Sequence, residues 1–261
     1  MKQTWSVKDL TEFVAKSIEN AREGSAPFYH LQFERVFPPD FYAEMLRTMP
    51  DDDDYRPMSG KTKMGSSRPD GKPTRTKIDL FPEYIRHLPE KKLTIWDLVG
   101  CALRSEKVKN ALIQKLEPSL QKRFGERFRS VGMYPVPILT RDIPGYRVFK
   151  HTDSLWKAIT CQLYLPADNS NTNIGTIFHE RSPDGSKPRR TQMPFAPNSG
   201  YAFAVADDTW HSADPVGPGV KTRDSILLTY FVDRGLWRSF RNRSRRIGNF
   251  LLNELRSRRR N

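Results

Sequence analysis

The chain has 261 residues, of which 37% are hydrophobic and 11% aromatic, enough for one globular domain with a helical extension. Two cysteines, Cys101 and Cys161, exclude a disulfide-stapled scaffold and fit a reducing compartment. The sequence has no apolar run suited to a signal peptide or to a membrane span of about 20 residues, so we expect a cytoplasmic protein.

The N-terminal third shows helix and loop signals. Ser6, followed by Asp9, is typical of a helix N-cap with an acidic first turn. Residues 26–36 are expected to form a strand, and Pro38-Pro39-Asp40 predicts the start of a second helix. The four aspartates at 51–54 indicate a solvated loop rather than a metal site. Residues 55–77, rich in Gly, Pro, Ser, Lys and Arg, predict a long mobile loop, either a lid or simply a flexible segment.

The middle of the chain changes from helical to β-prone patterns. Residues 93–124 predict two consecutive helices that break near residues 104–106. Short β-prone runs separated by turn residues then follow at 128–134, 137–141, 146–151, 158–165, 174–179, 201–205 and 223–232. Such a series suggests a sandwich or a jelly-roll barrel. We expect a helical lead-in over 1–127, a β core over 128–233 and a separate C-terminal segment over 234–261.

The tripeptide His151-Thr152-Asp153 lies in one of these β-prone runs. Alternate side chains of a strand share a face, so the imidazole and the carboxylate point the same way. They supply two-thirds of a 2-His-1-carboxylate site, the set that suits non-haem Fe(II) and leaves open coordination positions. His211 is the candidate for the third ligand, whereas the lone His179 is expected to be structural or to face substrate.

Four pieces of the sequence, together spanning residues 141–232, resemble the Fe(II)/2-oxoglutarate-dependent dioxygenases. They are the Gly-Tyr…His-Thr-Asp segment, Tyr164-Leu165-Pro166, the Trp-His…Pro-Val segment and Arg223-Asp224-Ser225, and their order matches the branch similar to prolyl 4-hydroxylases. The resemblance implies a mainly β fold with helical support (α+β), a double-stranded β-helix of the jelly-roll or cupin-like kind. Helices are then expected outside the major sheet.

The same resemblance implies a set of cofactors and residues that bind them. Fe(II) would be held by His151, Asp153 and His211, with 2-oxoglutarate and O2 as cosubstrates. Related halogenases lack this carboxylate, so Asp153 favours hydroxylation or another oxidation. Arg223 should pair with the far carboxylate of 2-oxoglutarate, and Ser225, two residues on in the strand, could add a hydroxyl donor.

Two further positions match contacts found in relatives but have ordinary alternatives. Tyr164 matches a tyrosine that touches the same carboxylate, and it could equally be a core aromatic residue. Alternation along its strand places Thr160 and Gln162 on the same face as Tyr164, which we expect to line the barrel lumen. Arg141 matches a further cosubstrate or substrate contact, or is an arginine of a surface loop.

The net charge of +14 is concentrated at the C-terminus. Residues 234–261 hold ten arginines and one glutamate, a charge of 10 − 1 = +9 that leaves about +5 for the rest of the chain. Their aromatic and aliphatic residues fall on one side of a helical wheel. This basic amphipathic helix, residues 236–261, would suit an anionic membrane surface, docking on the barrel or on a second subunit, or nucleic acid.

The charge and the resemblance together indicate several candidate substrates and partners. The basic charge fits hydroxylation of an unactivated C–H bond in an anionic or membrane-associated small molecule, such as a glycan or lipid intermediate. The enzymatic alternative is a protein side chain, as in prolyl hydroxylases. The alternative of another class is a nucleic-acid-binding protein that uses the arginine-rich tail and a non-catalytic barrel.

Overall fold

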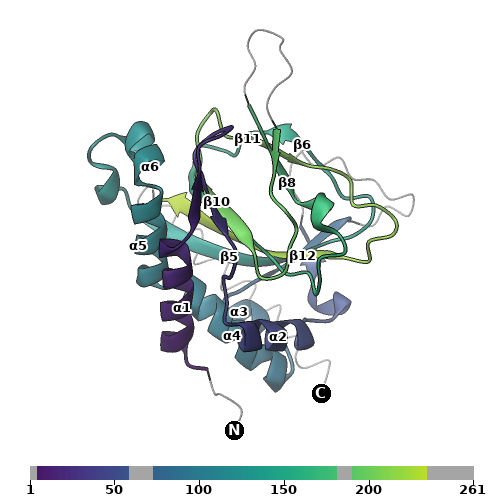
Figure 1. Cartoon of the computed structure of the whole chain (residues 1–261). Helices are drawn as coiled ribbons and strands as arrows, with labels where there is room; N and C mark the ends of the chain where they lie inside the picture. The colour runs from purple at the N-terminus through teal and green to yellow at the C-terminus, as the bar shows by residue number, and fades with distance from the viewer. Residues whose placement is uncertain (1–4, 59–72, 181–189, 234–261) are drawn as a thin grey trace.

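The computed structural model describes residues 5–58, 73–180 and 190–233. The expected C-terminal helix and the centre of the expected loop at 55–77 lie outside these residues. The described chain forms two antiparallel sheets with helices gathered on one side of the larger sheet (Figure 1). This arrangement agrees with the predicted double-stranded β-helix, although the two sheets are not joined into a closed barrel.

The larger sheet has eight strands in the described residues. In spatial order, the eight strands are β1 (Arg22–Gly24), β2 (His30–Phe33), β10 (Gly200–Ala204), β7 (Lys157–Tyr164), β12 (Arg223–Val232), β5 (Met133–Asp142), β4 (Arg75–Asp79) and β3 (Arg56–Pro57). Four of them, β1 to β4, come from the N-terminal part of the chain. The smaller sheet runs β6 (Val148–His151), β11 (Trp210–Ala213), β8 (Thr176–His179) and β9 (Arg190–Gln192). The expected lead-in is therefore part of the main sheet as well as its helical cover.

Within the described residues, six α-helices lie on the outer side of the larger sheet (Figure 1). They are α1 (Val7–Glu19), α2 (Pro39–Arg47), α3 (Pro82–Ile85), α4 (Glu90–Leu103), α5 (Glu106–Lys115) and α6 (Glu117–Phe124). Helix α1 begins as predicted, with Ser6 and Asp9 forming a capping box. Short 3₁₀ turns occur at Asp52–Asp54, Phe128–Ser130 and Thr172–Ile174. The acidic run at 51–54 therefore begins a turn rather than a metal site.

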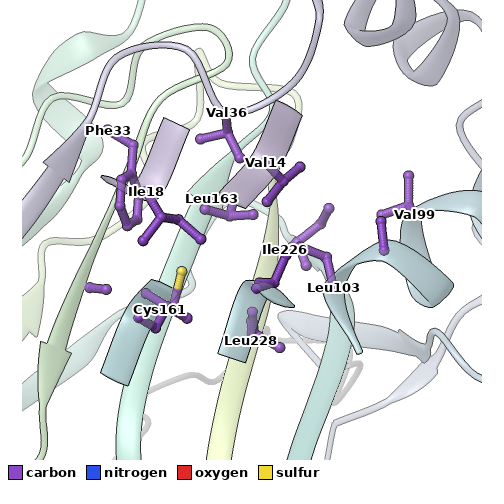
Figure 2. Close-up of a cluster of buried hydrophobic side chains, with 14 of the residues drawn as sticks. Val14, Ile18, Phe33, Val36, Val99, Leu103, Cys161, Leu163, Ile226 and Leu228 are labelled. Carbon is purple, nitrogen blue, oxygen red and sulfur yellow. The ribbon is translucent and has the colours of Figure 1, made fainter. Parts of the chain in front are cut away.

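Two hydrophobic clusters hold these layers together. In the outer cluster the apolar faces of α1 and α4 meet β7 and β12, as Figure 2 shows for Val14, Ile18, Val99, Leu103, Cys161, Leu163, Ile226 and Leu228. Each such aliphatic side chain contributes about 1.5–3 kcal/mol when fully buried. The inner cluster lies between the two sheets and is mainly aromatic, with Phe28, Tyr146, Tyr164, Phe178, Phe195, Tyr201 and Phe203 among its members.

The structure differs from the predicted elements in three places. Residues 93–124 lie in three helices rather than two, because Pro118 stands in the first turn of α6 and a new helix begins there. Residues 133–142 form one strand through two prolines. This is tolerated because β4 pairs only with residues 138–142, which leaves Pro135 and Pro137 with a partner strand on one side. Strands β3 and β4 occupy the ends of the expected mobile loop.

A search of the described helices found none that is both long and apolar enough to cross a membrane.

Candidate metal centre and the neighbouring arginine cluster

The small sheet brings together three residues that are far apart in sequence. Strand β6 pairs with β11 so that His151 stands directly opposite His211, and their ring centroids are 4.3 Å apart. Asp153 follows the end of β6 by two residues. One ligand atom from each of the three side chains lies within 4.8 Å of the others, and no other such group occurs among the described residues searched. The structure therefore places the three expected metal ligands together.

Both imidazoles are oriented for metal binding by the backbone. Nδ1 of His151 is 2.8 Å from the carbonyl oxygen of Phe149, and Nδ1 of His211 is 3.0 Å from that of Thr209. A carbonyl only accepts, so each Nδ1 must carry the proton and donate it. The lone pair then lies on Nε2, and this pattern of a backbone-anchored imidazole is the usual one around protein metal sites.

The electrostatics of the cluster favour a charged carboxylate and a neutral imidazole. Burial alone would raise the pKa of Asp153, but Lys157 and His211 outweigh it and hold that pKa well below its usual range. The Lys157 ammonium and the Thr160 hydroxyl each donate to Asp153 at 2.6 Å. Burial lowers the pKa of His211 to about 4, although Asp153 opposes this shift. Asp153 and His211 are therefore in the protonation states that a divalent cation requires of its ligands.

The lumen face of β7 connects this centre to a second polar cluster. Thr160, Gln162 and Tyr164 share that face, as alternation predicted, and Thr160 is the residue that contacts Asp153. Gln162 accepts from the Tyr201 hydroxyl at 2.8 Å and donates to Ser225 Oγ at 2.9 Å. A buried hydrogen-bond network thus runs along the lumen, away from the metal ligands.

Arg223 lies in this second cluster with its side chain almost completely enclosed. Its Nε donates to the carbonyl oxygen of Ile174 at 2.8 Å, and its NH1 donates to Oδ2 of Asp142 at 2.9 Å. The guanidinium carbon lies 5.6 Å from the ring centroid of Tyr164, whose hydroxyl donates to Thr176 Oγ1 at 3.1 Å. Arg223, Tyr164 and Ser225 therefore belong to one buried polar cluster on the inner face of the larger sheet.

A second arginine, which sequence reasoning missed, completes this cluster. Arg75 forms a two-point ion pair with Asp142, Nε to Oδ1 at 2.5 Å and NH2 to Oδ2 at 2.8 Å. Two guanidinium groups thus share one carboxylate, which leaves one net positive charge in a largely buried cluster. Buried charges require partners, so this cluster could pair with an additional carboxylate from a ligand.

Arg141 does not join this cluster. It neighbours Asp142 on β5 and therefore points to the opposite face of the sheet. There its Nε donates to Asp224 at 2.8 Å and its NH1 donates to Asp52 at 2.6 Å. These contacts make Arg141 an ion-pair partner on the outer face, separate from the pocket that holds Arg223.

The missed residues had weak signals in the sequence. Arg75 lies in a stretch whose composition resembles a loop, and only its pairing with β5 shows that it faces the lumen. Asp142 and Tyr201 belong to no motif in the sequence. Their role becomes apparent only when the strand order places them beside Arg223 and Gln162.

Comparisons with known proteins agree on the fold. No family model and no curated protein matches the sequence. Among solved structures, a prolyl 4-hydroxylase from Pseudomonas putida aligns over 86% of this chain and 99% of its own, with 13% identity and a TM-score of 0.52. An oxidoreductase of the 2OG-Fe(II) oxygenase family from Burkholderia pseudomallei is 12% identical, with 89% of this chain and 93% of its own chain covered and a TM-score of 0.46. A prolyl 4-hydroxylase from Phytophthora capsici is 14% identical, with 94% of this chain and 78% of its own chain covered and a TM-score of 0.48.

At these identities the likeness concerns the fold. The Pseudomonas putida match covers 86% of this chain and 99% of the other chain, so it is a likeness of the whole fold rather than of one motif. The chain therefore has the double-stranded β-helix fold of the prolyl 4-hydroxylases and related Fe(II)/2-oxoglutarate oxygenases, which confirms at the level of fold the resemblance drawn from its motifs.

Proposed function

We propose that this protein is an Fe(II)- and 2-oxoglutarate-dependent oxygenase that hydroxylates its substrate. The observation that carries the proposal is the convergence of His151, Asp153 and His211, with both imidazoles presenting Nε2 and the carboxylate charged. Two imidazoles and one carboxylate are the donor set that suits Fe(II) with open positions. The fold shared with a prolyl 4-hydroxylase supports the same assignment.

Different residues, at two ends of the lumen, would hold the metal and the distal carboxylate of 2-oxoglutarate. Iron with 2-oxoglutarate and O2 would supply the oxidising power for attack on a C–H bond. His151, Asp153 and His211 would hold the metal, while Arg223 would hold the distal carboxylate through its fork of N–H donors. Tyr164 and Ser225 would orient the polar groups around that carboxylate, and the aromatic residues between the sheets would exclude water.

The residues that flank the metal-ligand segment favour an anionic substrate with an apolar part. Phe149, Leu155 and Trp156 flank the metal-ligand segment and are 48%, 56% and 44% exposed. The Arg147 guanidinium lies 4.0 Å from the Phe149 ring centroid, so positive charge accompanies these exposed apolar groups. We infer that the substrate is a small molecule or a glycan or lipid intermediate that carries negative charge.

Conversion of 2-oxoglutarate to succinate tests the proposed reaction. We expect the purified protein with Fe(II) to form succinate, and His151→Ala and Asp153→Ala to lose that activity because each removes a metal ligand. Asp168→Ala, which removes an exposed carboxylate after β7, is the matched control and should behave as the unmodified protein. Full turnover in either ligand variant would contradict the assignment.

A further inference from the structure

We propose that Arg75 sets the charge of the Arg223 pocket and thereby gives it a preference for 2-oxo acids with a second carboxylate. Asp142 is the residue through which Arg75 acts. Both are positioning residues, since neither is assigned a contact with the reacting atoms. The inference rests on the proposed function, in which Arg223 holds the distal carboxylate of 2-oxoglutarate.

Strand register places the three side chains in one row. Asp142 stands opposite Arg75 on one side, where β5 pairs with β4, and opposite Arg223 on the other side, where β5 pairs with β12. Directly opposed residues of antiparallel strands share a face, so the row Arg75–Asp142–Arg223 crosses the lumen face of the sheet. Asp142 is completely buried, and Arg223 is 1% exposed.

Hydrogen bonds in this row fix the position of the Arg223 guanidinium. Both oxygens of Asp142 accept from Arg75, and Oδ2 also accepts from NH1 of Arg223. The carbonyl of Ile174 holds Nε of Arg223, whereas NH2 of Arg223 makes only a long contact of 3.5 Å to Thr176 within the described chain. One side of the guanidinium fork is thus anchored, and NH2 retains donor capacity for a ligand.

The charge of the row depends on Arg75. Without it, Asp142 would neutralise Arg223, and an incoming carboxylate would meet a pocket with no net charge and an adjacent buried anion. With it, Asp142 is already paired, and the row keeps a charge of +1. The Arg75 guanidinium also lies 4.2 Å from the Tyr146 ring centroid, which secures it beside Asp142. The row therefore suits a ligand with one carboxylate at this end.

Binding measurements on charge-altered variants test this inference. Calorimetry with Mn(II) in place of Fe(II) gives the affinity for 2-oxoglutarate without turnover. We expect Arg75→Gln to weaken 2-oxoglutarate binding by about 10- to 100-fold, the range typical for loss of a supporting partner. Adding Asp142→Asn to Arg75→Gln removes the unpaired carboxylate and restores the +1 charge, so the double variant should recover most of the loss.

A second ligand separates the charge effect from general damage to the pocket. 2-Oxovalerate has the same chain length but lacks the distal carboxylate, so Arg75→Gln should leave its affinity unchanged. Arg56→Gln, which breaks the ion pair with Asp79 on the neighbouring strands, is the matched control and should bind 2-oxoglutarate normally. Arg75→Lys keeps the charge and should retain most of the affinity, which provides a test even if Arg75→Gln fails to fold.

The outcomes distinguish this inference from the proposed function. Unchanged 2-oxoglutarate binding in Arg75→Gln, an equal loss for 2-oxovalerate, or a loss in Arg75→Lys as large as that in Arg75→Gln would overturn the role of Arg75. A double variant no better than Arg75→Gln would overturn the role of Asp142. Failure of the unmodified protein to bind 2-oxoglutarate with Mn(II) would instead contradict the proposed function itself.

Discussion

Two side chains donate hydrogen bonds to Asp153, one of the expected metal ligands. Lys157 donates to Oδ1 of Asp153 at 2.6 Å, so an ammonium group already contacts this carboxylate. Thr160 donates to the other oxygen. The same carboxylate would have to serve both Lys157 and a divalent cation, and the positive charges would repel each other.

Replacing Lys157 by Met should therefore tighten metal binding. We expect a gain of about 1 kcal/mol, close to the upper value for a partly exposed ion pair and equivalent to roughly fivefold in affinity. Competition between Mn(II) and a chromophoric chelator would measure it. Weaker metal binding in this variant would mean that Lys157 acts mainly by holding Asp153 in place.

At the scale of elements, helix α6 supports the metal-ligand segment from outside the sheet. Arg123 on α6 donates to the carbonyl oxygens of Leu155, Lys157 and Val205. Leu155 belongs to the connection between β6 and β7, which also carries Asp153, and Lys157 is the first residue of β7. A single side chain thus fixes the backbone just after a metal ligand.

Arg123→Met should lower both stability and metal affinity. Hydrogen bonds from a charged donor contribute about 1.5–3 kcal/mol each, so we expect a loss of at least 2 kcal/mol in the free energy of unfolding, measured with urea. Lys122→Met is the neighbouring control, because Lys122 is largely exposed and makes only a surface ion pair with Asp208. Equal effects of the two substitutions would exclude the supporting role of Arg123.

The elements also show which predictions the sequence could support. Helix caps and alternation along β7 are local, and both agreed with the structure. The lumen-facing role of β4 depends on pairing with β5, a contact between distant segments that local composition cannot reveal. Gly175 has a steric role that also depends on contact between distant segments: a Cβ there would lie 1.6 Å from the carbonyl oxygen of Met193.

The residues of the candidate site also differ in how far local sequence alone could predict them. His151, Asp153 and His211 were predictable because their motifs are compact and their chemistry is specific. Arg141 and Asp142 are adjacent in sequence, and which of them faces Arg223 is decided by strand register. That register placed Asp142 in the pocket and Arg141 in an ion pair on the other face.

At the scale of the whole molecule, the positive charge is concentrated at the C-terminus. Strand β12 ends at Val232, and the +9 segment at 234–261 follows it. We expect truncation after Asp233 to abolish binding to vesicles containing anionic lipid while 2-oxoglutarate turnover persists. Neutral phosphatidylcholine vesicles are the control. Undiminished binding of the truncated protein to anionic vesicles would contradict a membrane role for this segment, and salt-dependent binding of nucleic acid would support the alternative.

We propose that one lumen holds both the metal and the 2-oxo acid. Anaerobic titration of the protein and Fe(II) with 2-oxoglutarate tests this arrangement, because a chelate of Fe(II) with 2-oxoglutarate gives a weak visible charge-transfer band. We predict the band in the unmodified protein, and we predict that Arg223→Ala needs much more 2-oxoglutarate to develop it. Absence of the band in the unmodified protein would contradict the proposed metal and cosubstrate site.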